Sequence, residues 1–278
     1  MLRELTGRDV SIERPFTQPD LESDAVVDTA SAAVVRAYAD GDGPAVLDRA
    51  RAALASADVD GRVSSREVAE EDWAESWKEH FHIERFGERI VIVPSWRRYE
   101  AEAGDVVVTL DPGMAFGTGQ HETTRMCLEQ LERAVRPGAR VLDVGCGSGI
   151  LAIAAARLGA SGVLAVDVDA DCVRVTTENA RTNGVEGIVR VGHGSLGDAW
   201  PFEEPPAAFD VVVANIIARV IVDVAAELAS ALAGGGLLIV SGVIGAREGE
   251  VAGALAAAGL RVDGVRGMGD WRCMEAER

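Results

Sequence analysis

The chain has 278 residues and a formal net charge of −18, from 27 Lys and Arg against 45 Asp and Glu. This length accommodates one large domain, or one large domain with a smaller companion, and it can fold without a disulfide or a metal. Hydrophobic residues at 48% and charged residues at 26% exclude a disordered or fibrous chain. The acidity argues against a nucleic-acid-binding protein and against anionic membranes, whereas a cationic partner would be attracted.

Cysteine usage and hydropathy bear on the cellular compartment. The cysteines Cys127, Cys146, Cys172 and Cys273 have neither the Cys-x-x-Cys spacing of zinc sites nor the density of a disulfide framework, so we expect small core residues in a reducing cytosol. No apolar run approaches the ~20 residues of a membrane span, and the N-terminus lacks the apolar stretch of a signal peptide. A cytoplasmic location is therefore expected.

The N-terminal part of the chain predicts a small domain and a linker. Residues 1–63 are rich in Ala and Asp and predict an α/β unit with one helix over 44–57. Residues 64–80 predict a linker helix, in which Trp73 and Trp77 share one face because they are four residues apart. A helix that packs on its own domain is an equal alternative for this segment.

From residue 81 to 278 the pattern predicts one α/β domain, because apolar runs of strand length alternate with helical stretches. The alternating strands are expected at 140–144, 163–167, 188–191, 209–214 and 237–241. The helices between them are expected at 150–158, 170–183, 217–232 and 246–258, three of them closed by a glycine. This alternation predicts a doubly wound, mostly parallel sheet with helices on both faces. The runs 260–265 and 271–276 predict an antiparallel edge hairpin, which completes seven strands.

The sharpest motif is the glycine-rich segment Asp143–Gly149, between a predicted strand and its helix. Glycines let the backbone approach a ligand and direct its N–H groups at it. The spacing is G-x-G-x-G, not the G-x-G-x-x-G of dinucleotide-binding proteins. We therefore expect Gly145 and Gly147 to contact an amino acid and a nucleoside rather than a pyrophosphate.

The next two strand ends predict the rest of a nucleoside site. Asp167 ends a strand about twenty residues downstream, where a carboxylate can bind both ribose hydroxyls. Its alternative role is a helix N-cap. Ser195 lies in the loop after the third strand, which is placed to reach an adenine ring.

Asn215 ends the fourth strand, in the crevice where doubly wound folds bind ligands. Its amide oxygen can accept a proton from an amine and so aim the nitrogen lone pair at an electrophile. The alternative is an Asn that caps the following helix. Upstream, the glycine-rich segment 111–124 offers N–H groups and a hydroxyl to a carboxylate, although periodicity alone predicts a flexible turn.

Together these motifs resemble the ribosomal protein L11 methyltransferase family, called PrmA. The resemblance runs from about Glu71 to Trp271, and its motifs are Pro112–Gly119 with His121 and Thr123-Thr124, the glycine-rich segment, Asp167, and Ala214–Ile216. The sequence Pro-Gly-x-Ala-Phe-Gly-Thr-Gly is highly specific to the family. The glycine-rich segment is common to all class I methyltransferases that use S-adenosyl-L-methionine (AdoMet).

The resemblance implies a class I methyltransferase domain after a ferredoxin-like domain that recognises the substrate. The implied reaction is AdoMet-dependent trimethylation of lysine ε-amines and of the N-terminal α-amine of ribosomal protein L11. Thr124, Gly145, Asp167 and Asn215 match AdoMet-binding positions of the family. The motifs around them add Phe116, Thr118, Gly147 and Ser195 to the expected cofactor site.

Two residues are expected to act on the substrate: Asn215 orients the target amine, and His121 relays a proton. No metal is expected, because methyl transfer from a sulfonium needs none, and His80 and His82 are expected to be surface or packing residues. The expected partner is free ribosomal protein L11, without nucleic acid or membrane, and the chain is expected to be a monomer.

The small domain departs from the family pattern, because few residues precede the segment Asp9–Pro15, where the family has a strand and a helix. We expect the domain to lack its first βα unit, through altered recognition or a start codon placed too late. Two other functions stay open: a nucleic-acid N-methyltransferase of the same fold, and a non-catalytic AdoMet-binding module. The first usually has a basic face and often an aromatic residue or proline after the Asn, where this chain has Ile216.

Overall fold

The chain divides into two compact units, Met1–His80 and Phe81–Arg278. The computed structural model describes residues 10–13, 16–17, 26–27, 34–37, 43–56, 81–111, 121–206 and 208–278. The segment predicted as a linker helix and the loop that contains Phe116 and Thr118 lie outside the described residues.

The N-terminal unit contains two short antiparallel strand pairs and a helix. Strand β1 (Val10–Glu13) pairs with β4 (Val34–Ala37), and β2 (Phe16–Thr17) pairs with β3 (Val26–Val27). Helix α2 (Gly43–Ser56) lies within one residue of its predicted bounds. The ferredoxin-like arrangement of this unit stays a prediction.

The second unit is built on the predicted seven-stranded sheet, in the order β10-β9-β8-β11-β12-β14-β13. The first five of these strands in the order run parallel, and they are β10 (Val189–His193), β9 (Gly162–Asp167), β8 (Arg140–Val144), β11 (Phe209–Asn215) and β12 (Leu232–Ile244). Strands β14 (Trp271–Glu277) and β13 (Arg261–Met268) form the predicted antiparallel hairpin at one edge. The central strands β8 and β9 are buried at nearly every position because helices cover both faces of the sheet.

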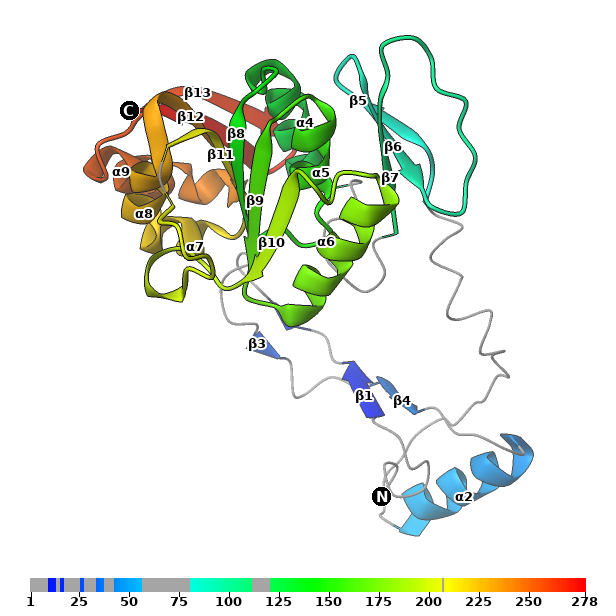
Figure 1. Ribbon diagram of the computed structural model, residues 1–278. Helices are drawn as coiled ribbons and strands as arrows, with labels where there is room; N and C mark the ends of the chain where they lie inside the picture. The colour runs from blue at the N-terminus through cyan, green and yellow to red at the C-terminus, as the bar shows by residue number, and fades with distance from the viewer. Residues whose placement is uncertain are drawn as a thin grey trace. The chain divides into compact units, whose positions relative to one another are not determined.

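Helices α4, α5 and α6 lie on one face of the sheet and α7, α8 and α9 on the other (Figure 1). Their bounds are α4 Glu122–Ala134, α5 Ile150–Arg157, α6 Ala170–Thr182, α7 Ala218–Asp223, α8 Ala225–Ala231 and α9 Glu248–Ala257, with 3-10 turns at Gly197–Ala199 and Gly245–Arg247. Two apolar cores result, one on each face. All four cysteines are buried with free thiols, as expected of core residues.

A smaller sheet precedes the main one in the same unit. Strands β5 (Glu84–Phe86), β6 (Ile90–Pro94) and β7 (Val106–Leu110) lie in that order, with β6 and β7 parallel. Most of the buried side chains of these strands, among them Phe86, Ile92 and Leu110, belong to the same core as α4 and α5. This sheet therefore extends the α4–α5–α6 side of the domain.

Two predicted elements differ most from the structure in their bounds. The helix expected at 217–232 is two helices, α7 and α8, which meet at Val224, where φ is −108° and ψ is 14°. The strand expected at 237–241 begins five residues earlier, because Leu232 already pairs with Phe209 ahead of an irregular glycine-rich stretch. Among the described residues, no helix is long and apolar enough to cross a membrane.

Candidate active site

The candidate site lies at the carboxyl ends of β8 and β11, where the order of the strands reverses. These strands are neighbours, but the chain leaves β8 toward α5 on one face and leaves β11 toward α7 on the other. Such a switch point opens a crevice at the carboxyl edge of a doubly wound sheet. The predicted residues Gly145 and Asn215 follow or end these two strands.

The glycine-rich loop between β8 and α5 brings backbone close to the end of β11. Gly145 has a φ of 76°, and its N–H donates to the carbonyl of Val166 at 2.8 Å. A Cβ atom on Gly145 would lie 2.3 Å from Cγ2 of Ile216. Only glycine combines this backbone conformation with so close an approach.

Helix α6 holds the loop from behind through two buried polar side chains. The Oγ1 of Thr176 donates to the carbonyl of Gly147 at 2.9 Å, and the Nδ2 of Asn179 donates to the carbonyl of Ser148 at 2.9 Å. Neither residue was predicted as part of the site. The sequence did contain a signal for them, because two polar residues three positions apart lie on the inward face of an amphipathic helix.

Asp167 is oriented by the backbone at the end of β9. Its Oδ2 accepts from the N–H of Gly147 at 2.9 Å, and its Oδ1 accepts from the N–H of Asp169 at 3.0 Å. The N-cap of α6 is Asp169, which accepts from the N–H of Asp171, so Asp167 is not the helix cap. Each oxygen of Asp167 has a further lone pair with which it can accept from a hydroxyl.

Asp143 is a completely buried carboxyl group beneath the loop, and we predicted no role for it. Its Oδ2 accepts from the N–H of Ala152 at 3.0 Å, whereas its Oδ1 has no hydrogen-bond partner in the structure. Burial raises the pKa of Asp143 to about 7, and the nearby charge of Asp167 acts in the same direction. A buried acceptor without a partner suits a ligand that brings a donor, above all a cationic one.

Asn215, at the end of β11, contacts Thr124, in α4, across the crevice. The Nδ2 of Asn215 donates to the Oγ1 of Thr124 at 3.3 Å, and Thr124 lies buried in the first turn of α4. The N-cap of α7 is Ile217, without a side-chain cap bond, so Asn215 does not cap that helix. The amide uses its donor side on Thr124, and its oxygen is the acceptor that an amine would need.

His121 is the N-cap of α4, a structural role that we did not predict. Its Nδ1 accepts from the N–H of Thr123 at 3.4 Å and lies 2.8 Å from the Oγ1 of the same residue. The ring also contacts Trp271 edge to face, with centroids 4.8 Å apart. The predicted proton relay stays a prediction.

The loop after β10 joins the same edge of the sheet. The N–H of Gly194 donates to the carbonyl of Asp167 at 2.8 Å, and the half-buried Ser195 follows it. The structure thus brings Thr124, Gly145, Gly147, Asp167, Ser195 and Asn215 to one edge. Among the described residues, no group of three or more His, Cys, Asp or Glu side chains could hold a metal ion.

A doubly wound sheet with a G-x-G-x-G loop after β8 and an acid at the end of β9 defines a class I AdoMet-dependent methyltransferase. The family model described as ribosomal protein L11 methyltransferase (PrmA) matches residues 2–278. The chain belongs to the ribosomal protein L11 methyltransferase family, as the motifs of the sequence predicted.

Individual relatives agree with the family assignment. The chain is 50% identical over 230 residues to the ribosomal protein L11 methyltransferase of Chloroflexus aurantiacus, over 76% of this chain and 70% of the relative. It is 44% identical over 275 residues to that of Herpetosiphon aurantiacus, over 91% and 85% respectively. The crystal structure of the ribosomal protein L11 methylase from Lactobacillus delbrueckii subsp. bulgaricus superposes with a TM-score of 0.64 and 35% identity, over 71% of this chain and 99% of that one.

Proposed function

We propose that this chain transfers methyl groups from AdoMet to amines of ribosomal protein L11. The observation that carries the proposal is the match to the family over residues 2–278, together with relatives at 50% and 52% identity that bear this name. The site agrees with it, because an Asn at the switch point faces a glycine-rich loop of the AdoMet-binding spacing. The amines are those that the sequence resemblance implies, lysine ε-amines and the N-terminal α-amine.

The residues present fit AdoMet. The unpartnered Oδ1 of Asp143 is the acceptor that a cationic amino group needs beneath the loop, and the loop at Gly145 has no room for a side chain. Asp167 would bind the ribose hydroxyls, Thr124 would bind the methionyl carboxylate, and Ser195 would lie beside the adenine. When bound, AdoMet supplies a methyl group on a sulfonium, which an amine lone pair attacks.

For methyl transfer, the amine of the substrate must be neutral and oriented, and the residues of this chain must bring it into that state. Deprotonation at pH 7 costs roughly 4.6 kcal/mol for a lysine of pKa 10.4, but only about 1 kcal/mol for an α-amine of pKa near 7.7. A desolvating crevice lowers the pKa of a lysine and so reduces this cost. Asn215 then needs only to accept one N–H of the neutral amine and hold its lone pair in line, so no strong general base is required.

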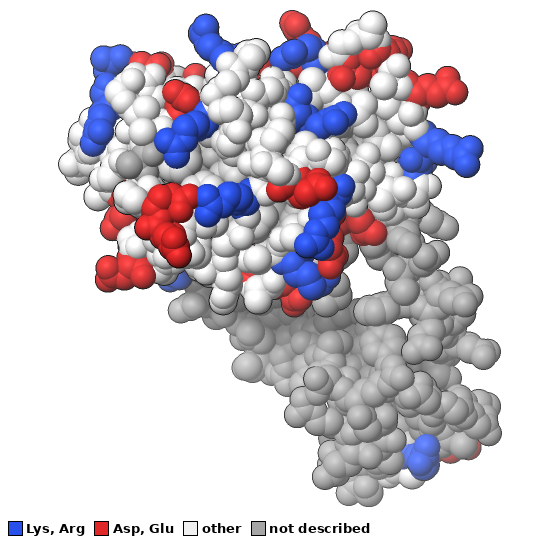
Figure 2. All heavy atoms as spheres, in the orientation of Figure 1, with Lys and Arg blue, Asp and Glu red and all other residues white. Residues whose placement is uncertain are grey.

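The alternative function, methylation of a nucleic acid, has weaker support. Figure 2 shows Arg side chains interspersed with Asp and Glu on one face of the molecule, not a continuous basic surface. Nucleic-acid recognition requires such a surface. Recognition of the substrate by the N-terminal unit, a monomeric state and a cytoplasmic location stay predictions.

The decisive experiment incubates the full chain with labelled AdoMet and either ribosomal protein L11 or ribosomal RNA. We expect label in the protein alone, and mass spectrometry then locates the methyl groups. The chain has a single lysine, Lys78, so self-methylation on lysine is simple to distinguish. Label in RNA, or in neither substrate, contradicts the proposal.

Replacement of Asn215 by Ala tests the reacting centre. The variant loses the acceptor for the amine and the bond to Thr124, so we expect kcat for L11 methylation to fall by about 100-fold or more. Asn183→Ala, which removes an amide that bonds β7 instead, is the control and should keep kcat within a few-fold. Equal losses in both variants would exclude a specific role for Asn215.

A further inference from the structure

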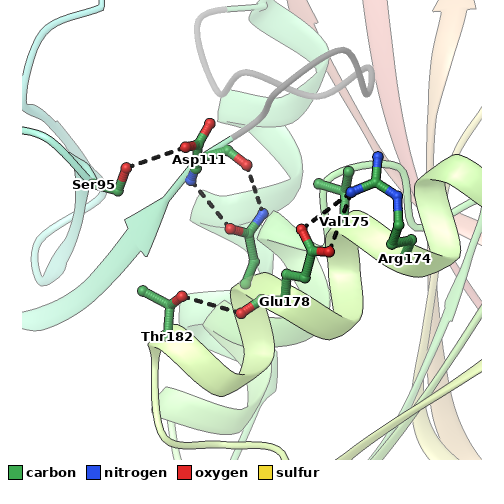
Figure 3. A pocket seen from close by; sticks show the side chains of 7 residues that line it. Ser95, Asp111, Arg174, Val175, Glu178 and Thr182 are labelled. Carbon is green, nitrogen blue, oxygen red and sulfur yellow. Dashed lines mark hydrogen bonds and ion pairs between the residues drawn. The ribbon is translucent and has the colours of Figure 1, made fainter.

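A cavity of about 330 Å³ lies beside α6, and none of the residues assigned to AdoMet or to the target amine lines it. It is bounded by the ends of the parallel strands β6 and β7 and by one face of the helix (Figure 3). Its lining residues are Ser95, Asp111, Arg174, Val175, Glu178, Asn179 and Thr182.

The cavity has a buried floor and a polar rim. Val175 and Asn179 are buried, whereas the other lining residues are exposed. Val175 gives the floor an apolar contact for the aliphatic part of a long side chain, and the polar rim suits a charged end. The volume is at the lower end for ligand sites, so it fits one long side chain and its neighbours better than a whole cofactor.

The charge of the rim favours a cation. Asp111 and Glu178 contribute two carboxylates against the single guanidinium of Arg174. That guanidinium is already shared, because its Nη1 lies 3.2 Å from both oxygens of Glu178 and its Nη2 lies 3.4 Å from Asp171. These exposed pairs are weak, so an incoming cation can compete for Glu178, whereas an anion would meet two carboxylates.

The floor of the cavity is tied to the glycine-rich loop. The Nδ2 of Asn179 donates both to the carbonyl of Asp111 at 3.1 Å and to that of Ser148 at 2.9 Å. The N–H of Asp111 donates back to the Oδ1 of Asn179 at 3.1 Å. One buried side chain therefore separates the cavity from the loop assigned to AdoMet, and a group in the cavity would lie at the same carboxyl edge as the reacting centre.

We propose that this cavity binds a lysine or arginine side chain of the protein substrate, next in space to the residue that is methylated. The aliphatic part packs on Val175, and the charged end bonds to Asp111 and Glu178. The inference rests on the proposed function, because it assumes a protein substrate. It adds a specificity site that acts on substrate binding and not on the chemical step.

The test measures steady-state methylation of ribosomal protein L11 by the full chain and by the double variant Asp111→Asn with Glu178→Gln. We expect KM for the protein to rise about fivefold to tenfold, as for the loss of a partly exposed charged contact, with kcat and the Kd for AdoMet within twofold. Arg174→Ala should act in the opposite direction and lower KM, because it leaves Glu178 without its guanidinium. Asp223→Asn is the matched control, because Asp223 is an exposed carboxylate at the end of α7, on the opposite face of the sheet.

The outcomes separate the two proposals. Absence of L11 methylation by the unaltered chain overturns the proposed function and this inference with it. Methylation by the unaltered chain, together with an unchanged KM in the double variant, overturns the inference alone. If the Kd for AdoMet rises by the same factor as KM, the inference is also overturned, because the effect would then arise from the glycine-rich loop.

Discussion

At the scale of single residues, two aspartates one strand apart show how environment assigns different tasks to the same side chain. Asp167 accepts two backbone N–H bonds at the rim of the crevice. Asp143 is completely buried, has one bonded oxygen, and has a pKa raised to about 7. Asp167 is therefore an oriented carboxylate. The burial of Asp143 costs desolvation free energy, which a cationic ligand can offset.

The pKa of Asp143 predicts how stability changes with pH. The folded pKa lies above the ordinary value of 3.8, so the folded state binds more protons between about pH 4 and 7. The contribution of this group to the free energy of unfolding therefore falls as pH rises through that window and levels off above it. For Asp143→Asn we expect a flatter pH profile and a gain at pH 8 of up to about 4 kcal/mol.

Urea unfolding of both proteins without AdoMet, at pH 5 and pH 8, checks this prediction. The difference between variant and parent must grow from the lower to the higher pH. A difference that is the same at both pH values would show that Asp143 is ionised throughout.

Asp167 predicts a loss in cofactor affinity. Asp167→Ala removes an oriented carboxylate from the end of β9, so we expect AdoMet binding to weaken by about 1 kcal/mol or more, which is at least fivefold in Kd. Isothermal titration calorimetry measures the change directly, with Asp169→Ala, which removes only the cap of α6, as the comparison. Unchanged affinity in Asp167→Ala would remove this residue from the site.

At the scale of elements, the connection from β8 to α5 shows why the loop must be glycine-rich. Gly145 has a positive φ and lies against Ile216, so backbone conformation and lack of space both require glycine. Thr176 and Asn179 then bond the loop to α6. The local shape of the site thus depends on a strand, a loop and two helices that pack together.

Replacement of Gly145 by Ala, compared with the same change at Gly138, separates the effect of backbone strain from the effect of the missing space for a Cβ atom. Gly138 also has a positive φ, of 89°, but a Cβ there would meet nothing within 4 Å. We expect Gly138→Ala to lose about 1 kcal/mol of unfolding free energy from backbone strain, and Gly145→Ala to lose more and to abolish measurable AdoMet binding. Thermal unfolding and calorimetry check both effects, and equal behaviour of the two variants would contradict the role of close packing at Ile216.

At the scale of the whole molecule, the net charge of −18 suits a basic, lysine-bearing substrate. Many of the exposed charges on the described surface are paired locally, as in Arg174 with Glu178 and Arg261 with Asp263. Such pairs leave the surplus of carboxylates to dominate at longer range. The net negative charge of the whole molecule should then attract a cationic protein, in addition to any single contact.

This attraction predicts a dependence on salt. Between about 25 and 250 mM salt we expect kcat/KM for ribosomal protein L11 to fall by at least about threefold, because screening weakens long-range steering. The kcat at saturating substrate should change far less. A kcat/KM that is independent of salt would show that the net charge does not assist encounter with the substrate.

Much of this architecture could be read from local patterns. The alternation of apolar runs predicted the parallel sheet, and the glycines predicted to end helices, Gly159, Gly184 and Gly259, all have positive φ. The division at Val224 could not be predicted, because Ala and Val continue the helical pattern through it. The early start of β12 was missed for a similar reason, since Gly234–Gly236 is typical of a turn, and only the pairing of Leu232 with Phe209, ahead of these glycines, makes Leu232 part of the strand.

By itself the sequence determined the class of fold, the family and the motif residues, because these depend on residue types at short spacing along the chain. The tertiary structure alone decided that β8 lies beside β11, that Asp143 has an unpartnered oxygen, and that Asn179 links the glycine-rich loop to the cavity beside α6. The physical reason is that strand order, desolvation and contacts between distant segments arise from packing. Spacing along the chain does not record them.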